Sequence, residues 1–190
     1  EMTLAMEEHR DELYFEIPNE WDDRIGYEEF LGEVKTALVL DSWIEETSED
    51  KLIERFRVQP GDLYKIIENA KWLLHATHEL AALFGSKVIL PLADELIERV
   101  SKGIKRELLP IVKLEGIGRV RGRIIFNAGY KTIEDIKHAD IGDLTNLPLI
   151  GPRVAKRIKE QVGGFVKKDE WERLEKGEEW KQKALTEYEG

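Results

Sequence analysis

The sequence predicts an all-α protein, in which a helical bundle with one long helix is followed by a small domain of short helices. Apolar residues recur at helical spacing through most of the first 100 residues. Only residues 13–17 and 87–90 have the apolar pattern of a short strand. Beyond residue 101 the apolar runs become shorter and glycines more frequent, which is typical of short helices joined by tight turns.

Four helices are expected in the bundle, over residues 27–45, 50–56, 62–84 and 91–100. Asp62 is placed to cap the long helix, because its carboxylate can accept hydrogen bonds from the unpaired N–H groups at a helix start. Gly85 is expected to end this helix, since glycine readily adopts the left-handed conformation that terminates helices. Pro91 suits the first turn of the next helix.

Charge is distributed unevenly along the chain, which carries −10 overall. Residues 101–168 hold 15 Lys and Arg against 7 Asp and Glu, a net charge of +8, whereas the rest of the chain carries −18. A basic block within an acidic chain indicates a local surface for an anion such as nucleic acid, although charges can also simply solvate helix faces. The sequence thus divides into residues 1–100, 101–168 and an acidic tail, 169–190, which is expected to be helical.

Composition excludes several classes of site. Without cysteine there is no disulfide and no thiolate metal site, as is usual in a reducing compartment such as the cytoplasm. No apolar run approaches the roughly 20 residues that cross a bilayer, and no signal peptide opens the chain, so no membrane partner is expected. His75 and His78 lack an evident third ligand apart from Glu79, and no metal is expected there. The first residues do not resemble a natural start, which suggests a fragment of a longer protein.

The basic segment contains an internal repeat with an offset of 33 residues, in which residues 114–125 correspond to 147–158. Ile117 aligns with Ile150, Gly118 with Gly151, and the small Gly122 with Ala155. The pattern hydrophobic-Gly-hydrophobic-Gly is typical of a helix-hairpin-helix. The second copy departs from it, because Leu149 replaces the first glycine.

This motif suits phosphate binding, because each hairpin leads into a helix N-terminus whose free N–H groups and dipole favour an anion. Basic residues after each hairpin supply charge for further phosphates. The second hairpin is expected to hold phosphate less well or to be structural only, and a simple tight turn remains the alternative for both. The candidate DNA-binding residues are Gly116, Ile117, Gly118, Arg119, Arg121 and Arg123 in the first copy and Gly151, Arg153, Lys156 and Arg157 in the second.

The long helix carries a tryptophan almost opposite its apolar stripe. Lys65 precedes Trp72 by seven residues, so the two side chains share a face about two turns, or roughly 10 Å, apart. Such a pair can stack a base and hold a neighbouring phosphate of single-stranded DNA. Packing of Trp72 against a neighbouring helix is the alternative.

Several stretches resemble a known family: residues 30–38, 43–46, 60–63, 70–73 and 117–123 with 127–129. They are similar to the C-terminal part of the Hjm family of archaeal superfamily II DNA helicases, which is related to the helicase of polymerase theta. The resemblance covers essentially the whole chain and suggests an archaeal, thermophilic source.

The resemblance implies a role for each segment. Residues 1–100 would form the helical-bundle ratchet domain that closes a ring around the translocating strand, and residues 62–84 would be its ratchet helix. Lys65 and Trp72 fall on the family's contacts with single-stranded DNA, although the lysine position is often arginine. Residues 101–168 would form the helix-hairpin-helix domain that holds the emerging strand and restrains the motor.

The resemblance also implies that the motor lies elsewhere. The sequence has no G-x-x-x-x-G-K-[ST] phosphate loop, so no cofactor is expected here, and ATP and magnesium belong to the motor domains. The expected function is DNA binding within an ATP-dependent 3′–5′ helicase, a hydrolase acting on forked or branched DNA in replication-fork repair and recombination. Its expected partners are single-stranded and forked DNA and the helicase's own motor and winged-helix domains, and its expected place is the nucleoid of the archaeal cytoplasm.

Two alternatives remain open. Gln182, Leu185 and Tyr188 have the spacing of a peptide that binds a sliding clamp, with Glu189 in place of the usual second aromatic, so the chain could be a protein-interaction scaffold. A helix-hairpin-helix DNA glycosylase would place a catalytic aspartate after the second hairpin, as at Asp169, but no catalytic lysine or base pocket is evident.

Overall fold

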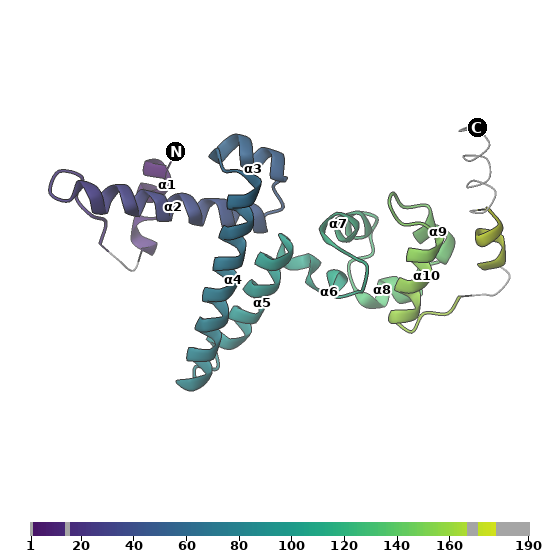
Figure 1. Cartoon of the computed structure of the whole chain (residues 1–190). Coiled ribbons are helices and arrows are strands. Elements are labelled where there is room, and N and C mark those ends of the chain that lie inside the picture. Colours follow the sequence, from purple (N-terminus) through teal and green to yellow (C-terminus); the bar gives the residue numbers. More distant parts are fainter. Residues whose placement is uncertain (1, 14–15, 167–170, 178–190) are drawn as a thin grey trace. The chain divides into compact units, whose positions relative to one another are not determined.

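The computed structural model describes residues 2–13, 16–166 and 171–177, and every regular element within those ranges is a helix (Figure 1). The predicted all-α class is therefore confirmed. The chain divides into two compact units, with the division between Lys105 and Arg106.

The first unit contains α1 (Met2–Glu8), a 3-10 turn (Arg10–Glu12), α2 (Arg24–Ile44), α3 (Glu49–Phe56), α4 (Pro60–Leu83) and α5 (Ile89–Lys102). Gly85 follows α4 with a φ of 71°, which confirms its predicted role as terminator. The prediction that Asp62 caps α4 is wrong. Gln59 is the N-cap and Pro60 opens the helix, so Asp62 lies in the first turn, where its carboxylate accepts a hydrogen bond of 3.3 Å from the Gln59 N–H.

The strand suggested at residues 87–90 is also wrong. Ile89 begins α5, which runs antiparallel beside α4 in a helical hairpin (Figure 1). A run of four residues is too short to distinguish a strand from the first turn of a helix by its apolar pattern. No second strand is present among the described residues to pair with it.

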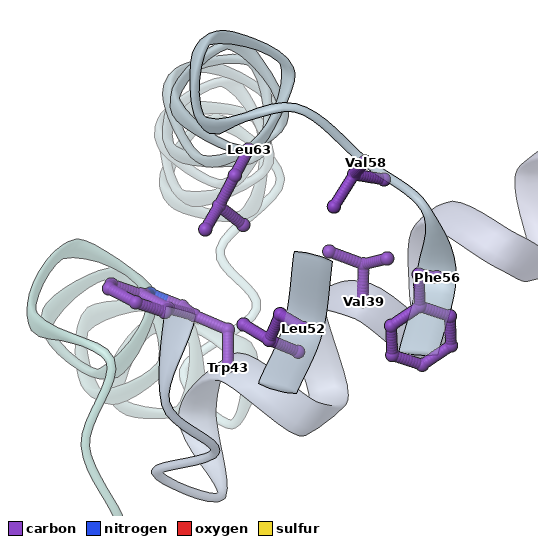
Figure 2. Packing of buried hydrophobic residues seen from close by; sticks show 6 residues of the cluster. All are labelled: Val39, Trp43, Leu52, Phe56, Val58 and Leu63. Carbon is purple, nitrogen blue, oxygen red and sulfur yellow. The ribbon is translucent and has the colours of Figure 1, made fainter. Parts of the chain in front are cut away.

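One apolar cluster joins α2, α3 and the start of α4 (Figure 2). Its buried members are Val39, Trp43, Leu52, Phe56, Val58 and Leu63. The short helix α3 contributes Leu52 and Phe56 one turn apart, so one face of a helix of eight residues is fixed by burial. This cluster anchors the first turns of α4 and thereby the register of the whole long helix.

The end of the first unit is attached to the same core. The buried Trp43 indole donates a hydrogen bond of 2.7 Å from Nε1 to the Val100 carbonyl near the end of α5. Gly103 caps α5 with a φ of 62°, and a Cβ at this position would overlap the Trp43 ring. Glycine is therefore required here both for its left-handed backbone and for the space that the ring occupies.

The two residues after this glycine are tied down as well. The Ile104 carbonyl accepts a hydrogen bond of 3.3 Å from Arg99 Nε. The Lys105 N–H donates to a Glu46 carboxylate oxygen at 3.0 Å, and its ammonium lies 3.1 Å from Glu45. The chain thus leaves the first unit along a fixed path.

The second unit contains a 3-10 turn (Arg106–Leu108), α6 (Leu109–Val112), α7 (Arg119–Asn127), α8 (Ile133–His138), α9 (Ile141–Thr145) and α10 (Pro152–Gln161), and residues 171–177 are helical. Helices α6 and α7 enclose the first predicted hairpin, and α9 and α10 enclose the second. Helix α8 connects the two motifs. The small residues of the repeat lie at helix crossings: Ala155 is fully buried, and a Cβ at Gly122 would come within 2.9 Å of Val112 Cγ1.

A buried lysine connects α8 to α10. Lys159 is only 2% exposed, and its ammonium donates hydrogen bonds to the carbonyls of Lys137 and Ala139, both at 2.6 Å, and of Ile136 at 3.5 Å. These carbonyls lie at the C-terminal end of α8, where backbone acceptors lack partners within the helix. Burial lowers the pKa of Lys159, and the nearby Asp140 carboxylate opposes this effect.

Candidate nucleic-acid interface

The two hairpins have the same backbone conformation despite their different sequences. Gly116 has a φ of 83°, and Leu149, its counterpart in the repeat, has a φ of 61°. In each hairpin the isoleucine N–H bonds to a carbonyl three residues earlier, Ile117 to Leu114 and Ile150 to Leu147, both at 3.1 Å. Leucine therefore adopts a left-handed conformation that normally favours glycine, and the second hairpin keeps the shape of the first.

Both hairpins lead into a helix whose N-terminus has no side-chain cap. The N-cap residues are Gly118 for α7 and Gly151 for α10. By contrast, Thr132 caps α8 and Asp140 caps α9 through side-chain oxygens. Within this unit, therefore, the two helices that follow hairpins leave their first N–H groups available, as an anion site requires.

Space is available beside the first of these helix ends. A Cβ at Gly118 would meet nothing within 4 Å, and the residue is exposed. The Ile117 side chain is buried in the core, so this predicted site residue can contribute only its backbone. A phosphate can approach the N-terminus of α7 without displacing any side chain.

The three arginines of α7 have different environments. Arg119 lies half-exposed in the first turn. Arg123 forms an ion pair of 2.9 Å with Glu107, and its guanidinium lies over the Phe126 ring at 5.1 Å. Arg121 lies between the hairpins, where Nε donates to the Leu149 carbonyl and Nη1 to the Gly116 carbonyl, both at 2.9 Å.

The cations of the second hairpin are more accessible. Arg153 is exposed, and within the described part of the chain its side chain has no ion pair or hydrogen bond. Arg157 is exposed and extends toward the first hairpin, where its Nη1 would lie 3.7 Å from a Cβ at Gly116. Lys156 lies over the Trp171 ring, 4.2 Å from its centroid.

A further contact between the hairpins was not evident from the sequence. Gln161, at the end of α10, accepts a hydrogen bond of 2.7 Å from the Glu115 N–H and donates one of 3.2 Å to the Glu115 carbonyl. Glutamine at a helix end has no distinctive spacing signal, and its partner is 46 residues away. The two hairpins are thus held together by one side chain from each hairpin helix.

Helix α4 places Lys65 and Trp72 on one exposed face. Trp72 is 70% exposed, so it does not pack against another helix of the described first unit. The sequence gave no separate indication that Leu80 and Leu83 would also be exposed on this side of the helix. Leu83 follows Trp72 by three turns and continues its apolar surface.

Several other candidate residues are not part of this surface. His78 lies 3.4 Å from Asp94 and from Glu79, and no group of three potential metal ligands occurs among the described residues. Gln182, Leu185 and Tyr188 of the predicted clamp-binding peptide lie outside the described residues, as does Asp169. None of the helices in the described ranges is both long enough and apolar enough to cross a bilayer.

Residues 1–103 match the family model of the archaeal helicase domain 4. The chain belongs to this archaeal helicase family. Residues 106–163 match the model of a SAM-like helix-hairpin-helix tandem, which agrees with the paired hairpins of the second unit. The resemblance of the sequence to archaeal DNA helicases is therefore confirmed.

Individual archaeal relatives agree with the family assignment. The chain is 40% identical over 159 residues to the ATP-dependent DNA helicase Hel308 of Pyrococcus horikoshii, which covers 83% of this chain and 22% of that protein. It is 41% identical over 164 residues to the Hel308 of Thermococcus kodakarensis, covering 86% of this chain and 14% of that protein. The Hel308 of Caldivirga maquilingensis is 42% identical over 156 residues, covering 79% of this chain and 21% of that protein. The archaeal helicase domain 4 and its hairpin tandem thus span about a fifth of most of these relatives.

Proposed function

We propose that this chain is the strand-handling part of an ATP-dependent DNA helicase, and that it holds DNA mainly through its sugar-phosphate backbone. The proposal is carried by the two glycine-capped helix N-termini of α7 and α10, which face no capping side chain in a segment of net charge +8. Backbone N–H groups and exposed cations such as Arg153 bind phosphate without reading the base. Binding of this kind depends little on sequence, as a translocating enzyme requires.

A second contact with DNA is proposed on α4. The exposed Trp72 offers a flat apolar surface on which a base can stack, and Lys65 lies two turns away on the same face for a neighbouring phosphate. In this arrangement α4 would contact the strand during translocation, and the hairpins would hold or slow it as it leaves.

The relatives' printed names support a whole-protein function that this chain would serve. We propose that the intact protein translocates 3′–5′ and unwinds forked or branched DNA in replication-fork repair and recombination in the archaeal cytoplasm. ATP and magnesium would bind to its motor domains, which, with the winged-helix domain, would be direct partners of this chain. By itself this chain is expected to hydrolyse no ATP.

Fluorescence anisotropy with labelled single-stranded and forked DNA tests this function. Binding should weaken steeply as salt rises, with a slope of about −0.7 in log K against log salt per single-strand phosphate contact. Trp72→Ala should weaken single-strand binding about tenfold, because a stacked base contributes on the order of 1–3 kcal/mol. Tyr64→Ala is the matched control, since Tyr64 is a similarly exposed aromatic on another side of α4. Absence of binding at low salt would refute the proposal.

A sliding-clamp contact is proposed as a second function of the tail. It is supported only by the pattern of Gln182, Leu185 and Tyr188. In a pull-down with the clamp, a Leu185→Ala and Tyr188→Ala double variant should lose binding, whereas Lys183→Ala should keep it. Equal retention of the double variant would rule this contact out.

A further inference from the structure

Arg121 is the one side chain that bonds to both hairpin turns among the residues that the structure describes. Its Nε donates to the Leu149 carbonyl and its Nη1 to the Gly116 carbonyl, each at 2.9 Å. A guanidinium is planar and presents its donors in a fixed fork, so two carbonyls held at these distances define the position of one hairpin relative to the other. The side chain is half-buried between them.

The two acceptors are equivalent positions of the repeat, and both have a left-handed backbone. Gly116 adopts its φ of 83° without strain, whereas Leu149 adopts its φ of 61° against the preference of its Cβ. Among the described residues of the second unit, Leu149 is the only non-glycine residue with a positive φ. The second hairpin therefore needs support that the first does not, and the Arg121 bond to the Leu149 carbonyl provides it.

We propose that Arg121 is a positioning residue, which locks the two hairpins into one phosphate-binding unit and does not itself bind DNA. The inference rests on the proposed function of the hairpins. Two of its donors are already bonded to carbonyls, and transfer to a phosphate would break both bonds and release the Leu149 turn. The phosphate ligands are then the helix N-termini and the exposed cations such as Arg153.

A charge-conserving variant provides the test. Arg121→Lys keeps the positive charge but not the fork, so it should weaken binding of the full chain to a fluorescein-labelled forked duplex about tenfold, the equivalent of one charge-assisted hydrogen bond. Adding Leu149→Gly should restore affinity to within about twofold of the Leu149→Gly single variant, because glycine adopts the left-handed turn unaided. Arg24→Lys, an exposed arginine of α2, is the matched control and should bind like the original protein.

Restoration by Leu149→Gly distinguishes positioning from direct binding. If Arg121 contacted phosphate, a change in the backbone preference of residue 149 could not replace the lost contact. Affinity that stays low in the double variant, or that does not fall in Arg121→Lys, would overturn the inference.

A spectroscopic measurement needs no variant. In DNA-free protein the Arg121 Nε–H proton should persist in nitrogen-correlated NMR spectra, protected by its bond to Leu149, whereas that of the exposed Arg153 should be lost to solvent exchange. An Arg121 signal that appears only on adding DNA would overturn the inference. Failure of the proposed function itself would look different, because neither Arg121→Lys nor Arg153→Gln would then change DNA binding while the Arg121 signal persisted, and the positioning role in DNA binding would fall with it.

Discussion

Replacing Gly118 with aspartate should strengthen the second unit while weakening its hold on DNA. Gly118 is the N-cap of α7, with a φ of −98° and a ψ of −171°, an extended conformation that aspartate adopts freely. A Cβ there meets nothing within 4 Å. The new carboxylate can accept hydrogen bonds from the first turn of α7, as Asp140 does from the Gly142 N–H at 2.7 Å in α9.

The two effects can be estimated separately. Aspartate in place of an N-cap glycine, with its favourable charge at the helix dipole, should stabilise the unit by about 0.5–1 kcal/mol. The same carboxylate occupies the phosphate's N–H donors and repels it, which should cost about 1.4–2.8 kcal/mol of binding, or 10- to 100-fold in affinity. The slope of log K against log salt should become shallower by about the value of one phosphate contact.

Urea unfolding and DNA anisotropy on the same preparation measure both quantities. Gly118→Asn is the matched control, because asparagine caps the helix with the same shape but without the charge. We expect it to be as stable as the aspartate variant and to bind DNA with intermediate affinity. If Gly118→Asp bound DNA as tightly as the original protein at low salt, phosphate would not lie at the N-terminus of α7.

Three further predictions concern stability. Lys159→Met should destabilise the second unit by about 2–4 kcal/mol, since it leaves the end of α8 without donors; because burial lowers the pKa of Lys159, the folded chain binds fewer protons than the unfolded chain at alkaline pH just below the pKa of an exposed lysine, so stability should rise with pH there in the original protein and not in the variant, as urea unfolding at several pH values would reveal. Gly103→Ala should cost about 2–4 kcal/mol by combining left-handed strain with overlap of the Trp43 ring, whereas Gly85→Ala, with a similar φ but open space, should cost only about 1–2 kcal/mol; equal losses in thermal unfolding would argue against the ring contact. Leu149→Gly should leave stability within about 1 kcal/mol of the original despite removing a leucine, because relief of strain offsets the lost contacts, and a loss typical of a core leucine would contradict this.

The sequence predicted the helices of both units well, because their signals are local. The 3.6-residue spacing of α2 and α4, the Gly85 terminator and the 33-residue repeat each require only a short stretch of chain. Errors arose where two local signals competed. Both Gln59 and Asp62 could have capped α4, and Pro60 decides the matter because it favours the first helical position.

The candidate site was only partly predictable. The hairpins, their glycine caps and the exposed face of Trp72 follow from repeat and periodicity. The environments of the basic residues do not, because Arg121 and Lys159 bond to carbonyls 28 and 20 or more residues away in the sequence. A basic residue near a phosphate site looks the same in sequence whether it binds the ligand or the backbone. Only the packed arrangement of both hairpins assigns Arg121 and Lys159 to the protein itself.

The attachment of Gly103, Ile104 and Lys105 to the bundle has a mechanical consequence. A glycine-ended helix followed by unbonded chain would act as a slack leash, and tension from DNA held by the hairpins would first be spent in straightening it. Here Trp43 closes over Gly103, and Arg99, Glu45 and Glu46 hold the next two residues. A pull on the second unit is therefore delivered directly to the core that anchors α4, so that drag on one unit is felt by the other without lost motion.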